Sequence, residues 1–223
     1  MIDGAHSGVP APHSVTRFKA SPMNSLMESW PRKHRITVDE YYRMAEVGLL
    51  APDARVELIG GEIIDMAPIG PRRGSIVDIL TRLFVRAVGD HAIVRTQGAI
   101  LLEQRSVPQP DLALLAPRKD DYRSAHPTPA DILLVIEVSD STLRYDRDVK
   151  VPLYARHGIP EAWIVDVQNG EWHGYRTLQG GSYAEQDSTK DPGFMRIASL
   201  PGITVDLTGV LSGLTADPSS EPN

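Results

Sequence analysis

Two acidic residues stand at the ends of short apolar runs, where acidic side chains are uncommon. Asp111 directly precedes the run Leu112–Leu115, and Glu137 directly follows the run Ile132–Ile136. If the two runs form neighbouring antiparallel strands, the start of one lies beside the end of the other, about 4.8 Å away. A divalent cation binds oxygen ligands at about 2.0–2.6 Å, so both carboxylates could share one metal ion.

A metal site is favoured over an acid–base pair at these two positions. Without a cation the carboxylates of Asp111 and Glu137 would repel each other, and one of them would be forced to keep a proton. Hard oxygen ligands favour magnesium or manganese. For either acid taken alone, the alternative is that it marks the water-exposed end of a strand.

Lys150 is the candidate cationic partner of this site. It lies at the beginning of the helical segment that follows Glu137, where its ammonium group could hold a water molecule or stabilise phosphate charge. The alternative is an exposed ion pair with Asp146 at i,i+4 spacing, worth about 0.2–0.5 kcal/mol.

Glu57 is a supporting candidate in a short β-prone run. It points to the opposite face from Val56 and Leu58, because successive side chains of a strand alternate between faces. From there it could reach the metal through water or bind a second ion. An ordinary exposed glutamate is an equally good interpretation.

The elements that must position these residues begin at Thr37. Thr37 and Glu40 have capping-box spacing, which predicts a helix start, and a second helix is predicted over 74–88 by apolar residues at three- and four-residue spacing. Two β-prone runs on either side of Gly60-Gly61 predict a hairpin. Further strands are predicted at 92–96, 99–103, 111–116, 132–136 and 161–166, with an irregular excursion over 117–130 and short strands over 171–207.

The segment from Tyr145 to His157 has a helical pattern, with Gly158 and Pro160 after it as stop signals. Pro152 inside a helix would cost about 3 kcal/mol, so we expect the helix to begin near Asp148. His157 is expected to cap its C-terminus, where a cationic ring is favourable.

The order of helices and strands indicates an α/β fold with a central mixed sheet flanked by helices. We expect a flexible N-terminal arm (1–35), one domain (36–208) and a disordered C-terminal tail (209–223).

The chain has no cysteine, which excludes disulfides and thiolate metal sites. The formal net charge of −6 counts against a generic polyanion binder but not against a nuclease with a local basic surface. No stretch approaches the roughly 18 apolar residues of a membrane span and no secretory signal is evident, so a cytoplasmic location is expected.

Four segments in fixed order carry a resemblance to a known family: Val56–Ile63, Gln109–Ala113, Ile136–Ser139 and Arg144–Asp166. Together they resemble the Uma-two family of restriction-endonuclease-like proteins, a branch of the PD-(D/E)XK nuclease superfamily. The resemblance covers roughly residues 36–178 and implies a restriction-endonuclease-like core. Any one of the segments alone is a weak signal, and the ordered set is specific.

The resemblance implies a hydrolase, a magnesium-dependent endonuclease that cleaves phosphodiester bonds of DNA and works as a homodimer. Asp111, Glu137 and the backbone carbonyl of Val138 would bind Mg²⁺ or Mn²⁺. Lys150 would position the attacking water or neutralise developing charge, and Glu57 would hold a metal-associated water or a second ion. Arg144 and Arg147 are candidate phosphate contacts, with solvated arginines as the alternative.

The sequence departs from the superfamily pattern at two positions. Ser139 stands where the usual lysine follows the second acid, and Lys150 takes over that role from the next helix. Arg73 stands where family members often carry a histidine. The main alternative function is therefore a catalytically weak module of the same fold that binds nucleic acid or a partner protein. A more distant alternative is a hydrolase of small phosphoesters.

Overall fold

The computed structural model describes residues 33–212 together with Met1. The chain divides into two units, Met1–His34 and Arg35–Asn223, and the fold below is that of the second unit. The predicted arm (1–35) lies almost wholly outside the described residues, as does most of the predicted tail (209–223). Their flexibility and the predicted domain bounds stay predictions.

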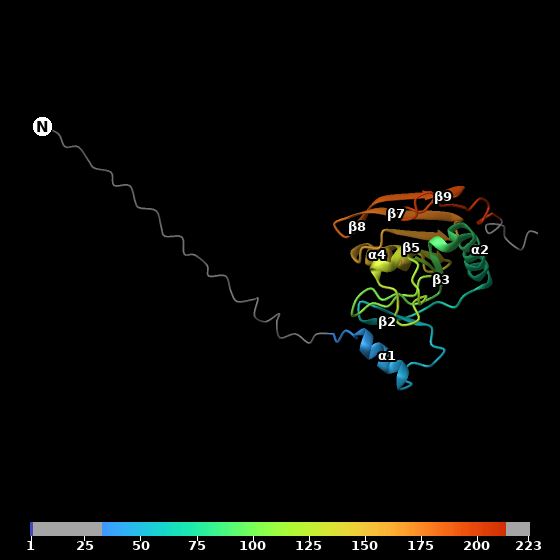
Figure 1. Cartoon of the computed structure of the whole chain (residues 1–223). Helices are drawn as coiled ribbons and strands as arrows, with labels where there is room; N and C mark the ends of the chain where they lie inside the picture. The colour runs from blue at the N-terminus through green and yellow to red at the C-terminus, as the bar shows by residue number, and fades with distance from the viewer. Residues whose placement is uncertain (2–32, 213–223) are drawn as a thin grey trace, which may run out of the picture. The chain divides into compact units, whose positions relative to one another are not determined.

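A six-stranded mixed sheet forms the centre of the unit (Figure 1). Every pair of neighbouring strands is antiparallel except β5–β6, which is parallel. The predicted α/β fold with a central mixed sheet is confirmed. The spatial order of the strands is β3 (Ile93–Thr96), β4 (Leu112–Leu115), β5 (Ile132–Ser139), β6 (Glu161–Asp166), β7 (Glu171–Gln179) and β8 (Ser182–Thr189).

Helices cover both faces of this sheet. The helix α2 (Pro71–Val88) packs on one face in a core cluster that includes Leu134 of β5. The helix α4 (Val151–Arg156) packs on the other face in a second cluster that includes Val135. Because side chains alternate between the two faces of a strand, β5 is apolar on both sides, as its uninterrupted apolar run predicts.

The first helix and the hairpin are found where the sequence predicts them. α1 (Val38–Glu46) begins after Thr37, whose backbone N–H donates to the Glu40 carboxylate at 2.8 Å while its hydroxyl accepts from the Glu40 N–H. This reciprocal pair is the predicted capping box. α2 starts at Pro71, three residues before the predicted 74–88, because proline at the first helical position loses no hydrogen bond.

The hairpin pairs β1 (Val56–Ile59) with β2 (Glu62–Asp65) in antiparallel register. Gly60 and Gly61 form the two-residue turn with φ of +57° and +79°. Two consecutive left-handed residues are the requirement of a type I′ turn, which explains why two glycines separate the strands. The hairpin and α1 share a third, smaller core cluster around Leu58.

The predicted strand at 99–103 is wrong. The segment is extended, but its amides donate to scattered acceptors, including the carbonyls of Pro108 and Pro127, and only an isolated bridge joins Glu103 to Ser106. These two acceptors are prolines, which have no N–H to donate back, so no regular ladder can form along them.

The helix that carries Lys150 begins earlier than expected. Helical structure starts at α3 (Leu143–Tyr145), continues through a π-helical segment, η4 (Asp146–Lys150), and runs directly into α4. The predicted start near Asp148 is therefore wrong. A π turn is wider than an α turn, and it accommodates Pro152 without ending the helix.

The remaining described elements are short. They are the 3₁₀ turns η2 (Gly89–His91) and η3 (Pro129–Asp131) and the hairpin of β9 (Phe194–Arg196) with β10 (Thr204–Asp206). Trp163 is 1% exposed and belongs to the core cluster on the α2 face. Among the described residues, no helix is both long and apolar enough to cross a membrane.

Candidate active site

The strand register places Asp111 opposite Glu137. Leu112 of β4 pairs with Ile136 of β5 in an antiparallel ladder, so one step further along the ladder Asp111 faces Glu137. Leu112 and Ile136 belong to the core cluster on the α2 face. Their neighbours Asp111 and Glu137 therefore point to the opposite face, towards the helix that carries Lys150. The antiparallel arrangement assumed in the sequence prediction is confirmed.

Six ionisable side chains of this region are buried. The two opposed acids are each 2% exposed, which rules out the alternative that they mark a water-exposed strand end. The others range from 3% to 8% exposed. We call these residues the buried charge cluster: Glu57, Arg73, Asp111, Glu137, Asp146 and Lys150.

Lys150 joins the hairpin to the central sheet. Its Nζ lies 3.0 Å from Oε1 of Glu137 and 3.2 Å from Oε2 of Glu57. Oε2 of Glu57 also accepts the backbone N–H of Gln109 at 3.1 Å. The structure therefore brings the four predicted residues into one buried group, with Lys150 between two of the three acids.

Glu137 has a second partner in α4. The hydroxyl of Tyr154 donates a short hydrogen bond to Oε1 of Glu137. Tyr154 is fully buried one helical turn after Lys150, so both side chains project from the helix onto the same carboxylate oxygen. Helix and strand together fix the orientation of Glu137.

Asp111 is held by β5 and by α2. Its Oδ2 accepts the backbone N–H of Val138 at 2.8 Å. Nη2 of Arg73, in the first turn of α2, lies 2.9 Å from both carboxylate oxygens. The amide of Gln97 is a weaker partner of Oδ1 at 3.5 Å.

Asp146 supports the site from the π-helical segment. Its Oδ2 accepts the hydroxyls of Ser139, at 2.7 Å, and Thr142, at 2.6 Å. The alternative of an exposed Asp146–Lys150 ion pair is wrong, because both residues are buried and Lys150 pairs with the other acids. Ser139 ends β5 and fixes Asp146 to it.

Burial and charge set the protonation of the cluster. Burial raises the pKa of Glu137 to about 8; Lys150 opposes this rise, and the negative charges of Asp146, Asp111 and Glu57 add to it. Burial alone would lower the pKa of Lys150, but the carboxylates of Glu137 and Glu57 outweigh it and raise that pKa above its usual value. Lys150 is therefore a permanent cation at neutral pH.

The donor set fits a hard divalent cation in ligand type and in charge. With all groups ionised, four buried carboxylates face two cationic side chains, which leaves two negative charges uncompensated. Between residues 33 and 212 no three acidic or histidine side chains converge as metal ligands. The side-chain ligands would be Asp111 and Glu137. The N–H and the carbonyl of one strand residue point to the same side, so the carbonyl of Val138, whose N–H donates to Asp111, would be the backbone ligand.

The two candidate phosphate contacts lie outside the buried charge cluster. Arg144 is 93% exposed and lies 3.7 Å from Asp148, and Arg147 pairs with the same carboxylate at 2.7 Å. Their role as phosphate contacts stays a prediction. His157 is the C-cap of α4 as expected, with Nδ1 2.8 Å from the carbonyl of Leu153.

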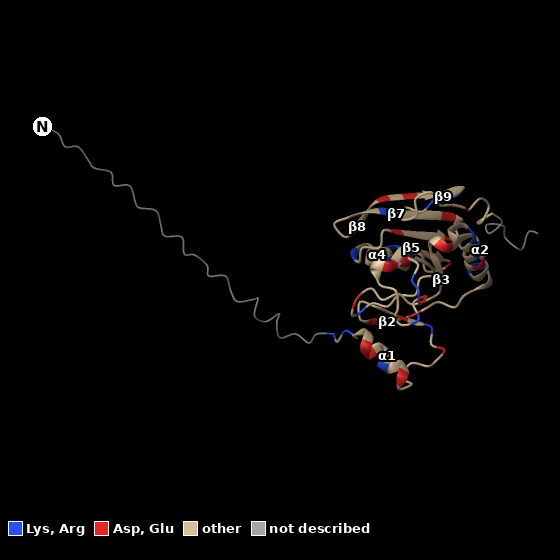
Figure 2. Cartoon of the chain, in the orientation of Figure 1, with Lys and Arg blue, Asp and Glu red and all other residues tan. Residues whose placement is uncertain are grey.

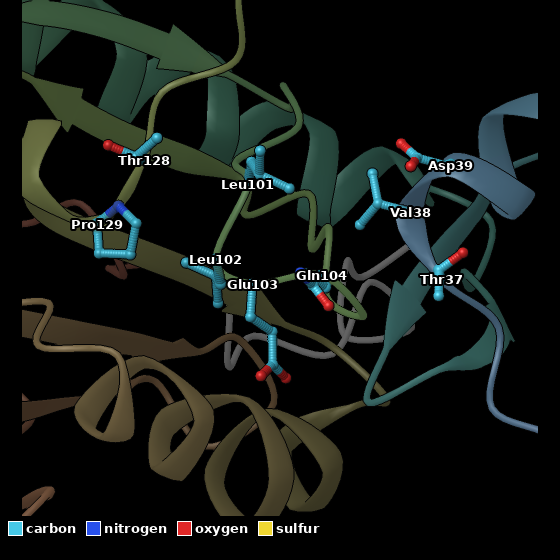
Figure 3. A pocket seen from close by; sticks show the side chains of 9 residues that line it. All are labelled: Thr37, Val38, Asp39, Leu101, Leu102, Glu103, Gln104, Thr128 and Pro129. Carbon is cyan, nitrogen blue, oxygen red and sulfur yellow. The ribbon is translucent and has the colours of Figure 1, made fainter.

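A separate cavity of about 440 Å³ lies between the N-terminus of α1, the segment 101–104 and residues 128–129 (Figure 3). None of the residues of the buried charge cluster lines it. Its charged lining groups, Asp39 and Glu103, are acidic, which disfavours a phosphate ligand. We therefore place the candidate site at the cluster and not at this cavity.

Two residues that support the site were not predicted to do so by the sequence analysis: Arg73 and Asp146. A usable signal existed for Arg73, since an arginine on the apolar side of a helix needs an acidic partner. For Asp146, the signal was the preceding Ser139 and Thr142, whose hydroxyls can both donate to a carboxylate.

Comparison with known proteins identifies the fold and the family of the chain. The chain is similar to a solved structure described as a putative nuclease belonging to DUF820 from Anabaena variabilis, with 17% identity and a TM-score of 0.62, over 80% of this chain and 99% of that one. This likeness shows the shared fold. No curated protein matches the sequence. A family model, Uma2, described as "Putative restriction endonuclease", matches residues 38–208. The chain belongs to the Uma2 family.

Proposed function

We propose that this protein is a magnesium-dependent endonuclease that hydrolyses phosphodiester bonds of DNA. The observation that carries the proposal is the pair Asp111 and Glu137, opposed on adjacent strands, with Lys150 3.0 Å from Glu137. Membership of a restriction-endonuclease family and the nuclease-like fold support a nuclease. The metal and the DNA substrate are the parts that the proposal adds.

In this proposal Asp111, Glu137 and the Val138 carbonyl hold Mg²⁺ or Mn²⁺. All are oxygen ligands, which these two metals prefer. A cation bound there would supply Lewis-acid stabilisation of the phosphoryl group and make an attacking water more acidic.

Lys150 acts as a charged hydrogen-bond donor and not as a base. Its raised pKa keeps the proton on Nζ, so the ammonium group can orient water or stabilise charge that develops on a phosphoryl oxygen. Glu57 fixes Lys150 from the hairpin side and is placed to hold a water molecule or a second cation. Tyr154 keeps the Glu137 carboxylate in position through its hydroxyl.

The DNA substrate and the homodimer are supported by family analogy and by local charge. Figure 2 shows basic and acidic residues interspersed along the elements of the domain, and the net charge of −6 is that of the whole chain. Arg144 and Arg147 supply exposed positive charge on the helical segment that carries Lys150. We propose that they contact phosphates, and light scattering of the purified protein tests the dimer.

One observation favours the alternative function of a catalytically weak binding module. Both oxygens of Asp111 accept hydrogen bonds from Nη2 of Arg73, so the charge of this one metal ligand is compensated without a metal. Under this alternative the protein binds nucleic acid or a partner without cleaving it.

The test is cleavage of supercoiled plasmid, linear duplex DNA and single-stranded RNA by the full-length chain. Each substrate is incubated with Mg²⁺, with Mn²⁺ and with EDTA. Cleavage of DNA with either metal and none with EDTA is the expected result. A folded protein that binds DNA but leaves all substrates intact would move the assignment to the binding module.

A further inference from the structure

Arg73 is the cation nearest to Asp111, and its contact has an unusual form. A single nitrogen, Nη2, bridges both carboxylate oxygens at 2.9 Å. The stable arginine–carboxylate pair uses two nitrogens in parallel, one for each oxygen. The Nε of Arg73 is buried and has no hydrogen-bond partner.

An unsatisfied buried donor carries a free-energy cost, so this pairing is weaker than the burial of Arg73 suggests. The residue is 8% exposed, and the unpaired Nε cannot turn to bulk water without movement of the guanidinium group. The contact therefore compensates the charge of Asp111 but leaves the Nε–H donor of Arg73 without an acceptor.

Asp111, by contrast, does not need Arg73 to keep its position. The Val138 N–H holds Oδ2 at 2.8 Å, and the Gln97 amide approaches Oδ1. Removal of the guanidinium group would leave the carboxylate held by these two donors, and the side of each oxygen that Arg73 now contacts would be open to another cation.

We propose that Arg73 competes with the divalent cation for Asp111 and so sets the metal affinity of the site. The inference rests on the proposed metal-binding role of Asp111 and Glu137. In the metal-free protein the guanidinium group neutralises Asp111, and metal binding requires its displacement. The free energy of metal binding is therefore less favourable than for the same carboxylates without Arg73, by the free energy of the contact that is lost.

The test is titration of Mn²⁺, followed by electron paramagnetic resonance of the free ion, with no nucleic acid present. The variants are Arg73→Gln, which removes the charge, and Arg73→Lys, which keeps it. Arg86→Gln is the matched control, because it removes one positive charge from an exposed position of the same helix. We expect Arg73→Gln to bind Mn²⁺ at least tenfold more tightly than wild type, with the other two variants within about threefold of it.

The outcomes separate this inference from the proposed function. If wild type binds Mn²⁺ and Arg73→Gln binds it no more tightly, the competition is refuted and the metal site remains. If neither protein binds Mn²⁺, both ideas fail. Circular dichroism shows whether Arg73→Gln folds. If this variant folds only when Mn²⁺ is added, the competition is supported, because the metal then replaces the guanidinium group at Asp111. Failure to fold even with saturating Mn²⁺ refutes it, because the metal then cannot replace the guanidinium group.

Discussion

Nζ of Lys150 lies 3.0 Å from Oε1 of Glu137, and this contact ties the helical segment 143–156 to the central strand β5. The residue two positions after Glu137 is Ser139. Its hydroxyl donates to Asp146 and is not available to Glu137. The cation of the site therefore comes from the helix, and the π-helical segment decides where it lies.

Replacement of Lys150 by methionine is predicted to destabilise the metal-free protein by about 3–5 kcal/mol. The change leaves the buried carboxylates of Glu57 and Glu137 without their shared cation, and an unpaired buried charge carries a cost of that size. Urea unfolding in EDTA measures the effect. The control is Lys119→Met at an exposed position, and an equal loss of stability in both variants would contradict the prediction.

Loss of the Tyr154 hydroxyl is predicted to weaken both the fold and the metal site. Tyr154→Phe removes a buried hydrogen bond to a carboxylate, worth about 1.5–3 kcal/mol, and frees Glu137 to rotate. Tyr183→Phe is the matched control, because it removes a buried hydroxyl that donates to the Ile159 carbonyl, a neutral acceptor.

Both tyrosine variants are unfolded in urea and titrated with Mn²⁺. We expect a loss of about 0.5–1.5 kcal/mol and no change in metal affinity for Tyr183→Phe. The same metal affinity in Tyr154→Phe as in wild type would show that Glu137 needs no support from the helix.

Glu137 is predicted to make the metal-free protein less stable as the pH rises. Its pKa is raised from 4.5 to about 8 on folding, so the folded state binds this proton more tightly than the unfolded state. The stability that this proton confers is complete below the unfolded pKa and is lost as the pH rises through the folded value. Added Mg²⁺ offsets the loss by compensating the carboxylate charge.

The measurement is the free energy of unfolding of wild type and Glu137→Gln in EDTA, from about pH 5 to about pH 8. Glutamine cannot ionise, so the difference between the two proteins should change with pH in favour of the variant. Parallel stability curves would show that Glu137 does not titrate in this range.

The opposed acids could be predicted from sequence because their surroundings are simple. Apolar runs after Asp111 and before Glu137 specify buried strands, and strand alternation then fixes the face on which each carboxylate lies. Capping boxes and paired glycines likewise depend on local chemistry, which explains why α1 and the β1–β2 hairpin are found where they were expected.

The helix that carries Lys150 could not be predicted correctly from Pro152 alone. Proline has no N–H and therefore removes one α-helical hydrogen bond. Because proline is tolerated in the first turn of a helix, the sequence predicts a helix that begins just before Pro152. The chain resolves it with a π-helical segment, which is stabilised by contacts with other elements, such as that of Lys150 with Glu57 of the hairpin.

Arg73 and Glu57 show a second limit. Their partners, Asp111 and Lys150, lie far away along the chain, so their burial depends on how α2 and the hairpin dock against the sheet. The place of Arg73 on the apolar side of α2 indicates burial but does not identify its acidic partner. No local pattern distinguishes Glu57 from an exposed glutamate.

The most direct test of the account is metal-dependent cleavage of supercoiled DNA by Asp111→Asn, Glu137→Gln and Lys150→Met. Asp90→Asn and Lys119→Met are the matched controls, since both residues are exposed outside the cluster. The account predicts that the three cluster variants, each confirmed as folded by circular dichroism, lose at least a hundredfold in rate, while the controls cleave like wild type. Cleavage that survives Asp111→Asn and Glu137→Gln would contradict it and place the hydrolytic centre elsewhere on the chain.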